Sequence, residues 1–173
     1  MANPKQRERT LRDLFIARLT DVYDSEKQLI KALPDMAAAA QSPKLRAAFT
    51  EHLAATQGQL QLLEQVFGLL DLKAKGTRCD GIAGIIDEAR DAIEGMTPSP
   101  VRDAALAASG RLAVHYEIAT YGDLLAIGDA LGHSNVSKRL GKILVQQDAT
   151  EKRMSELGLA ALKLAQEEMP VEA

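Results

Sequence analysis

Two glutamates occupy positions that the helical pattern reserves for apolar side chains. Glu26 falls at the centre of a series with three- and four-residue spacing that includes Leu19, Val22 and Leu29, and Glu117 falls at the centre of a similar series. At about 100° per residue around each helix, both carboxyl groups point to the inner face. A buried carboxylate without a partner costs several kcal/mol, so two that face one another are explained if a divalent or trivalent cation neutralises them.

Polar residues also mark the inner face of the next helical segment. His52, Thr56 and Gln59 share this face. Folding the chain back on itself at residues 42–43 places Glu26 level with Thr56 and Gln59, because antiparallel helices rise equally per residue. The first hairpin therefore brings a carboxyl group and two polar side chains to one height.

The last helical segment repeats this arrangement. Gln147 and Glu151 share its inner face, and folding the second hairpin at residues 132–134 places Glu117 between them in height. Each half of the chain therefore brings a glutamate and a pair of polar residues to the middle of the bundle. This agrees with the plan of di-iron bundles, in which two helices each supply a Glu and the other two each supply a Glu and a His.

The histidines are more ambiguous than the glutamates. His52 lies opposite Pro34, whose missing N–H leaves the Ile30 carbonyl without its helical donor. His52 is therefore either a structural donor beside this kink or a metal ligand. His115 is two residues from Glu117 and points about 160° away from it, which favours a surface, crossover or dimer contact. Any one polar residue in an apolar stripe also has a simpler explanation, since long helices use such residues to set their register.

Turn signals divide the chain into four long helical segments with one short segment between them. The breaks fall at residues 42–43, 76–81, 95–100 and 132–136, and a short amphipathic piece covers 82–93. Apolar residues at helical spacing define the inner faces of the long segments. These residues are Leu11, Phe15, Leu19, Val22, Leu29 and Leu33; Leu45, Phe49, Leu60, Leu63 and Phe67; Leu106, Gly110, Ala113, Tyr121 and Leu124; and Leu140, Leu144, Met154 and Leu162.

The connections between these segments predict the topology. The first pair and the last pair are joined tightly, which makes each pair an antiparallel hairpin, and a long middle connection joins the two hairpins. This is the wiring of ferritin-like bundles. The sequence therefore predicts an all-α, ferritin-like four-helix bundle, with a short extra helix in the crossover, as a single domain over residues 1–173.

Composition narrows the class of protein. The 173 residues are 46% hydrophobic but only 3% aromatic, so small and aliphatic side chains must fill the core, which suits close helices better than a sheet. Interspersed charges with a net charge of −3 argue against nucleic-acid binding. No apolar run approaches the roughly 18 residues of a membrane span. The single cysteine, Cys79, fits a reducing compartment. We expect a soluble cytoplasmic protein in which Cys79 is a small buried residue.

Several segments of the chain resemble a known family, the YciE/YciF-like ferritin-like proteins. The similarity covers about Leu11 to Leu162, and its His-Tyr-Glu and Cys segments are fairly specific. The resemblance implies a ferritin-like bundle, a homodimer, and a bacterial protein associated with stress responses, but it implies no reaction. The similar segments are Leu19-Thr-Asp-Val-Tyr-Asp-Ser-Glu-Lys-Gln-Leu29 with Leu33-Pro34, Phe49-Thr-Glu-His52 with Leu63-Glu-Gln-Val-Phe67, Cys79-Asp-Gly-Ile-Ala-Gly84, and His115-Tyr-Glu-Ile-Ala-Thr-Tyr-Gly122.

The chain departs from the family's pattern near the expected site. Ala55 and Gln147 stand where relatives often carry carboxylates, and Glu151 stands where they commonly have an Asp. The expected set, Glu26, Glu117 and Glu151, has three carboxylates, whereas a full di-iron centre has four carboxylates and two histidines. Hard oxygen ligands suit iron, manganese or magnesium. A single or weakly held ion is therefore expected over a redox-active pair of irons.

The leading hypothesis is a ferritin-like protein of the bacterial stress response that holds one or two iron or manganese ions. The alternative is a structural or interaction protein that keeps the bundle and a dimer interface without metal chemistry. The missing acids disfavour a two-metal oxidase or peroxidase, so no reaction is assigned. Neither a nucleic acid nor a membrane is an expected partner. The candidate ligands are Glu26, Glu117, Glu151, Gln147 and His52, with Tyr23 and Tyr121 as supporting donors.

Overall fold

The computed structural model describes residues 9–168, and this part of the chain is helical throughout apart from short connections. The described residues contain no strand, which confirms the all-α prediction. None of their helices is long and apolar enough to cross a membrane. The helices are α1 (Leu11–Ala39), α2 (Pro43–Leu69), α3 (Asp80–Gly95), α4 (Pro100–Ala130) and α5 (Ser134–Glu167).

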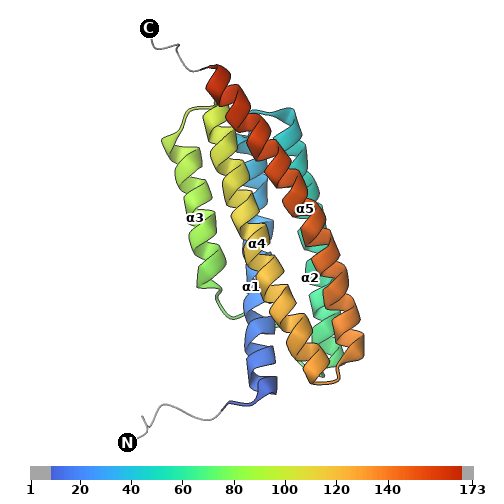
Figure 1. Ribbon diagram of the computed structural model, residues 1–173. Helices are drawn as coiled ribbons and strands as arrows, with labels where there is room; N and C mark the ends of the chain where they lie inside the picture. The colour runs from blue at the N-terminus through green and yellow to red at the C-terminus, as the bar shows by residue number, and fades with distance from the viewer. Residues whose placement is uncertain (1–8, 169–173) are drawn as a thin grey trace, which may run out of the picture.

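Four long helices run side by side, and the short helix α3 lies along the outside (Figure 1). α1 packs mainly on α2, and α4 packs most extensively on α5. α2 also contacts α5, and α1 contacts α4, so the two hairpins face each other. α3 rests against α4 and α1. The predicted short helix over 82–93 is confirmed and is slightly longer than expected.

Local sequence signals explain where the helices begin. α1 starts with a capping box in which Thr10 accepts a hydrogen bond from the Asp13 backbone N–H and the Asp13 side chain accepts one from Thr10. Ser42 and Ser99 cap α2 and α4, and each is followed by a proline at the first helical position, where a missing N–H costs nothing. Pro34 does not end α1, which continues to Ala39.

The core forms two apolar clusters with a polar layer between them. One cluster contains Leu33, Phe49 and Leu106, and the other contains Phe15 and Leu140. Nearly all of the predicted inner-face residues are buried or half-buried. Glu26 and Glu117, the two glutamates predicted to point inward, lie between the residues of the two clusters along α1 and α4.

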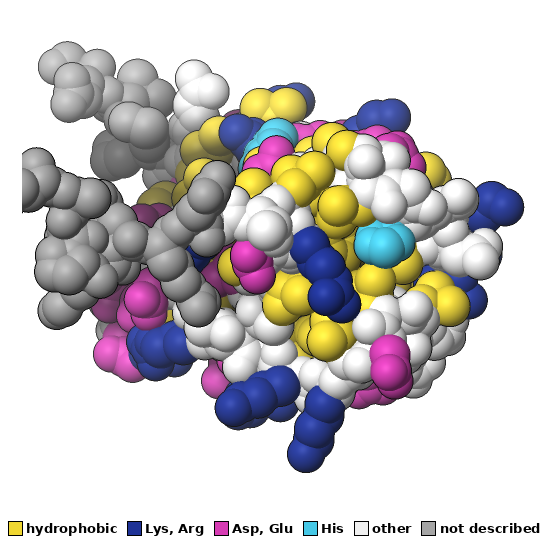
Figure 2. Space-filling view, turned by 90° about the horizontal axis from the view of Figure 1, so that it is seen from below, with side chains coloured by type: hydrophobic (Ala, Val, Ile, Leu, Met, Phe, Trp, Pro, Cys, Tyr) yellow, Lys and Arg dark blue, Asp and Glu magenta, His cyan; other side chains and the backbone are white. Residues whose placement is uncertain are grey.

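Two predicted core positions are wrong. Leu162 is exposed and Ala161 is buried instead, because a step of seven residues from Met154 stays on the same helix face whereas a step of eight rotates about 80° away. Leu11 is exposed because it begins α1 at the end of the bundle. Figure 2 looks onto this end and shows hydrophobic side chains gathered in its middle. Leu14 in α1 and Leu69 at the end of α2 are exposed as well.

A buried carboxylate holds the turn between α1 and α2. Asp103, in the first turn of α4, accepts hydrogen bonds from the backbone N–H of Gln41 at 2.8 Å and of Ser42 at 2.7 Å. Its neighbour Arg102 donates to the carbonyl of Ala39 at the end of α1. The two hairpins are thereby fixed at one end, which sets the height of α1 and α2 relative to α4.

We expect Asp103→Ala to lower the free energy of unfolding by about 1.5–3 kcal/mol, because it removes a charged acceptor from two backbone donors. Urea unfolding measures this loss. Asp123→Ala is the matched control, since Asp123 is an exposed residue of the same helix. Equal losses in the two variants would contradict a role for Asp103 in holding the turn.

Candidate functional site

Four helices contribute side chains to the polar layer between the two apolar clusters. Glu26 comes from α1, Gln59 from α2, Glu117 and Tyr121 from α4, and Gln147 from α5. All five side chains are 0% exposed. The predicted convergence of two inward glutamates with polar residues of α2 and α5 is therefore present in the described structure.

Hydrogen bonds tie the layer together across helices. Tyr121 Oη donates to Glu26 Oε1 and joins α4 to α1. Gln147 Nε2 donates to Glu117 Oε2 at 2.9 Å and to Gln59 Oε1 at 3.2 Å, which joins α5 to α4 and α2. Each carboxyl group therefore has one oxygen engaged by a neutral donor.

The remaining oxygens of the layer are not satisfied by the protein. No described group hydrogen-bonds to Glu26 Oε2, Glu117 Oε1, Gln147 Oε1 or Thr56 Oγ1, and all four atoms are buried. Buried polar atoms are normally paired, and each unpaired one costs about 1–3 kcal/mol. These four oxygen atoms therefore remain available to an additional partner, such as a cation.

Burial changes the protonation of the two glutamates. Desolvation raises the pKa of Glu26 to about 8, and the hydrogen bond from Tyr121 only partly offsets this. The pKa of Glu117 is raised well above its usual value, first by desolvation and then by the negative charge of Glu26. Desolvation and both carboxylates also raise the pKa of the Tyr121 phenol. Without a cation, the layer therefore favours its protonated, neutral forms near pH 7.

His52 lies apart from this layer. It lines a small cavity of about 10 Å³ together with mostly apolar residues such as Leu33, Ile85 and Ala113. Neither imidazole nitrogen has a partner among the described residues, so the predicted hydrogen bond to the Ile30 carbonyl is not formed. Desolvation lowers the pKa of His52 to about 4, which keeps the ring neutral.

Glu151 also lies apart from Glu26 and Glu117. Its Oε1 accepts a hydrogen bond from Ser155 at 2.7 Å and lies 3.3 Å from His115 Nε2. Its side chain is 23% exposed, whereas the two glutamates of the layer are fully enclosed. His115 is exposed, as its direction on the helix predicts. The Glu151 side chain is thus directed towards His115 and Ser155 near the surface and not into the layer.

The donor set of the layer is smaller than the sequence predicts. Within residues 9–168, no group of three His, Cys, Asp or Glu side chains is arranged to hold a metal ion. The groups that do converge are two carboxyls, two amides and one phenol, all of which offer oxygen atoms. Oxygen donors suit hard cations such as Mg²⁺, Mn²⁺ and iron. The residues present therefore fit one such ion better than a full two-metal centre.

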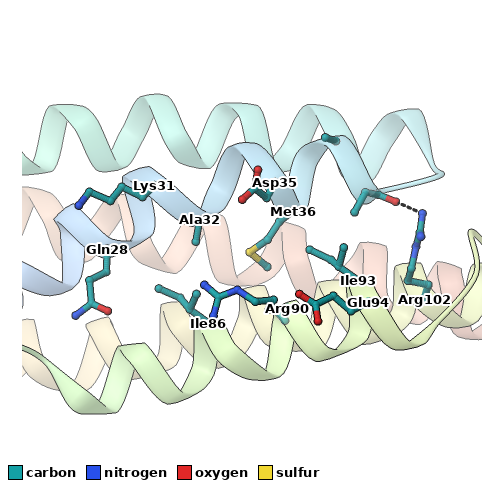
Figure 3. A pocket seen from close by; sticks show the side chains of 13 residues that line it. Gln28, Lys31, Ala32, Asp35, Met36, Ile86, Arg90, Ile93, Glu94 and Arg102 are labelled. Carbon is teal, nitrogen blue, oxygen red and sulfur yellow. Dashed lines mark hydrogen bonds between the residues drawn. The ribbon is translucent and has the colours of Figure 1, made fainter.

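Two other features of the chain do not connect with the layer. A groove of about 820 Å³ runs between α1 and α3; its apolar walls include Met36 and Ile93, and charged side chains such as Lys31 and Arg90 lie along it (Figure 3). No residue of the polar layer lines it. Cys79 is buried beside Tyr116, and desolvation raises the pKa of its thiol, so it behaves as the small buried residue that we predict.

The sequence gives only weak signals for the interhelical hydrogen bonds of Tyr121 and Asp103. Tyr121 stands four residues after Glu117 on the same face, so its closeness follows from the pattern, but its bond to Glu26 on another helix does not. Tyr23, proposed as a second supporting donor, instead donates to Glu64 at 3.2 Å. The sequence does not predict the contact of Asp103 with the turn between α1 and α2, because an acidic residue in the first turn of a helix is common without any role beyond that turn.

The sequence of this chain matches a known protein family over almost its whole length. The model of a family described as "Domain of unknown function (DUF892)" matches residues 10–167. Protein YciF of Escherichia coli K12 is 39% identical over 152 residues, which cover 87% of this chain and 92% of YciF.

Solved structures give the same relationship. The structure of the E. coli stress protein YciF matches with a TM-score of 0.86 at 38% identity and covers 90% of this chain and 99% of that one. YcfI of Rhodopseudomonas palustris, for which a structural role has been suggested, matches with a TM-score of 0.84 at 36% identity, covering 87% and 96%. A Xanthomonas campestris protein at 19% identity shares the fold, with a TM-score of 0.72.

We expect the stability of the metal-free protein to fall as pH rises from 6.5 through about 8. A glutamate in the unfolded chain has a pKa of about 4.5 and is already deprotonated in this range, whereas Glu26 and Glu117 keep their protons in the folded state. Because the folded state binds more protons, its stability falls as pH rises. Above pH 6.5 His52 is neutral in the folded state and mostly neutral in the unfolded state, so its contribution, which has the opposite sign, is small there. Urea unfolding after dialysis against a chelator measures the slope, which Glu117→Gln should reduce. An unchanged slope in that variant would argue against the protonated pair.

We expect His52→Leu to raise the free energy of unfolding by about 1–2 kcal/mol at pH 7, because it replaces an unsatisfied buried ring by an apolar side chain. The gain should grow towards pH 5, since the lowered pKa of His52 makes the parent lose stability as pH falls from 6.5 towards 4. Thermal unfolding at both pH values measures it. His115→Leu, at an exposed site, is the control and should show no such gain.

Proposed function

Because this chain belongs to the DUF892 family, as a relative of YciF, we propose that it is a ferritin-like bundle that binds one metal ion, iron or alternatively manganese, in its polar layer. The observation that carries the proposal is the pair of fully buried carboxyl groups that each keep one oxygen without a partner among the described residues. A cation neutralises both groups and turns an unfavourable burial into a favourable one.

The proposed ligands are those that the structure brings together. Glu26 and Glu117 supply two negative charges, and Gln147 supplies a neutral amide oxygen through its unpartnered Oε1. Glu151 and His52 are not in the proposed set. Glu151 is engaged by Ser155, and His52 is surrounded mostly by apolar side chains. The metal would supply charge neutralisation at this layer, and the chain's own residues would exclude water from it.

The relatives support a proposal for the biological setting. YciF is described as a stress protein, and we propose the same association for this chain, in the cytoplasm and as a homodimer. Sedimentation equilibrium of the untagged protein tests the homodimer. We assign no reaction, because the described layer has too few carboxylates and no histidine for the two-metal oxidase or peroxidase plan.

A structural role without metal is the second candidate function. It is supported by hydrogen bonds that already link all four long helices at the layer, from Tyr121 to Glu26 and from Gln147 to Glu117 and Gln59. The suggested structural role of YcfI is consistent with it. The unpartnered oxygens favour the metal-binding proposal over this one, since a layer closed for structure alone would satisfy them.

We expect the untagged protein, loaded anaerobically with ferrous iron and desalted, to retain roughly one ion per chain. Glu26→Gln with Glu117→Gln should retain none, because both charged ligands are gone while the shape of the layer is kept. Elemental analysis measures the retained metal, and manganese is tested in parallel. Loading should also raise the melting temperature of the parent and leave that of the double variant unchanged.

The matched control is Glu51→Gln with Glu94→Gln, which removes two exposed carboxylates and should retain iron like the parent. Iron retention by the double variant of the layer, or none by the parent, would contradict the metal-binding proposal. In the second case the structural role becomes the better-supported function.

A further inference from the structure

The charged side chains that line a groove between α2 and α5 are all basic. The groove has a volume of about 320 Å³, and it is lined by Leu62 and Gln65 of α2 and by Lys138, Arg139 and Lys142 of α5. Small-molecule sites have volumes of about 300–1,000 Å³, so this groove lies at the lower end of their range. No residue of the polar layer lines it, which makes it a candidate binding site separate from the proposed metal layer.

The three cations of the groove have no acidic counterpart in the described part of the chain. None of them forms an ion pair with a described residue. Residues 134–147 of α5 contain no Asp or Glu. Residues 52–69 of α2 contain one acid, Glu64, which accepts a hydrogen bond from Tyr23 on α1. Because the whole chain has a net charge of −3, this excess of positive charge is local to the groove.

Neutral acceptors hold the guanidinium of Arg139 in place. Its Nε donates to Gln65 Oε1 on α2 at 3.1 Å, and its Nη1 donates to the carbonyl of Asn135 at 2.9 Å. Farther along the same two helices, Arg153 of α5 lies 3.2 Å from a carboxylate oxygen of Glu51 on α2. Arg139 is therefore positioned without being neutralised, and no described group accepts a hydrogen bond from its Nη2.

The two lysines of the groove also lack the usual compensation along their own helix. Lys138 and Lys142 are exposed and four residues apart, a spacing at which like charges on a helix repel each other. Lys152, farther along α5, instead has Asp148 and Glu156 four residues before and after it. This arrangement opposes folding of the free protein, and a bound anion would relieve it.

We propose that the groove binds a small anion that carries a diphosphate group. One phosphate group has about 1.5–2 negative charges at pH 7, so a single group leaves at least one of the three cations uncompensated, whereas two linked groups compensate all three. The guanidinium of Arg139 offers directed hydrogen bonds to phosphate oxygens, and Lys138 and Lys142 supply charge.

Calorimetric titration of the untagged full-length protein with pyrophosphate tests the proposal. The buffer has physiological salt, which screens weak attraction between exposed charges, and EDTA, which prevents pyrophosphate from binding through a metal ion. Orthophosphate and a hexaglutamate peptide are titrated for comparison. The expected result is one pyrophosphate per chain, bound about tenfold or more tightly than either of the other two anions.

Variants assign the binding to the groove. Lys138→Gln with Lys142→Gln should weaken pyrophosphate binding by about tenfold or more, because two of three cations are lost. Arg139→Lys should weaken it as well, since the charge stays but the planar fork is lost. The matched control is Lys152→Gln with Lys163→Gln, which removes two exposed cations from the same helix and should bind like the parent.

Thermal unfolding keeps the test decisive if a variant changes the stability of the fold. Pyrophosphate should raise the melting temperature of the parent and of the control pair, because it binds the folded state, and should leave that of the Lys138 and Lys142 variant unchanged. Without pyrophosphate this variant should melt no lower than the parent, since it lacks the repelling pair.

Three outcomes would overturn the proposal: no binding of pyrophosphate by the parent, equal weakening in the control pair, or equally tight binding of orthophosphate. Binding of hexaglutamate without binding of pyrophosphate would also overturn it and would assign the groove to an acidic segment of a protein. Iron retention by the polar layer is decided separately, because the groove and the layer share no residue.

Discussion

The burial of two carboxyl groups in the middle of the helices is the constraint on which the rest of this structure depends. Glu26 and Glu117 are completely enclosed, and each must find compensation at one height of the bundle. Because a carboxyl group in an apolar surrounding is costly, the neighbouring helices must present polar side chains at that same height. Gln59 and Gln147 do so from α2 and α5, and Tyr121 does so from α4.

This requirement reaches well beyond the layer. A shift of one helix by a single turn would separate the glutamates from their amide and phenol partners by about 5.4 Å. The apolar clusters on either side of the layer resist such a shift through packing, and Asp103 resists it at one end of the bundle by holding the turn between α1 and α2. The contact of Asp103 with this turn and the hydrogen bonds of the central layer therefore both fix the relative height of the helices.

The same layer limits the chemistry that this member of the DUF892 family can perform. Oxygen atoms are plentiful in it, but charged ligands are few, because Glu151 turns towards His115 and Ser155. The metal binding that we propose would therefore depend on two carboxyl groups and on neutral oxygen donors. The likeness to YciF extends over nearly the whole fold, yet the function has to be argued from these side chains.

The helices, the crossover helix and the two inward glutamates follow from the sequence alone, because helical periodicity and turn chemistry are local properties. Only the tertiary structure decided which polar side chains meet. Glu151 and His52 lie on inner faces by periodicity. Glu151, however, accepts a hydrogen bond from Ser155 and lies 3.3 Å from an exposed histidine, and His52 lines a mostly apolar cavity. The hydrogen bond from Tyr121 to Glu26 joins residues that are 95 positions apart. The hydrogen bonds that Asp103 accepts from Gln41 and Ser42 join residues about 60 positions apart. Side-chain rotamers and helix heights set such contacts, and neither is encoded in the spacing of residues along one helix.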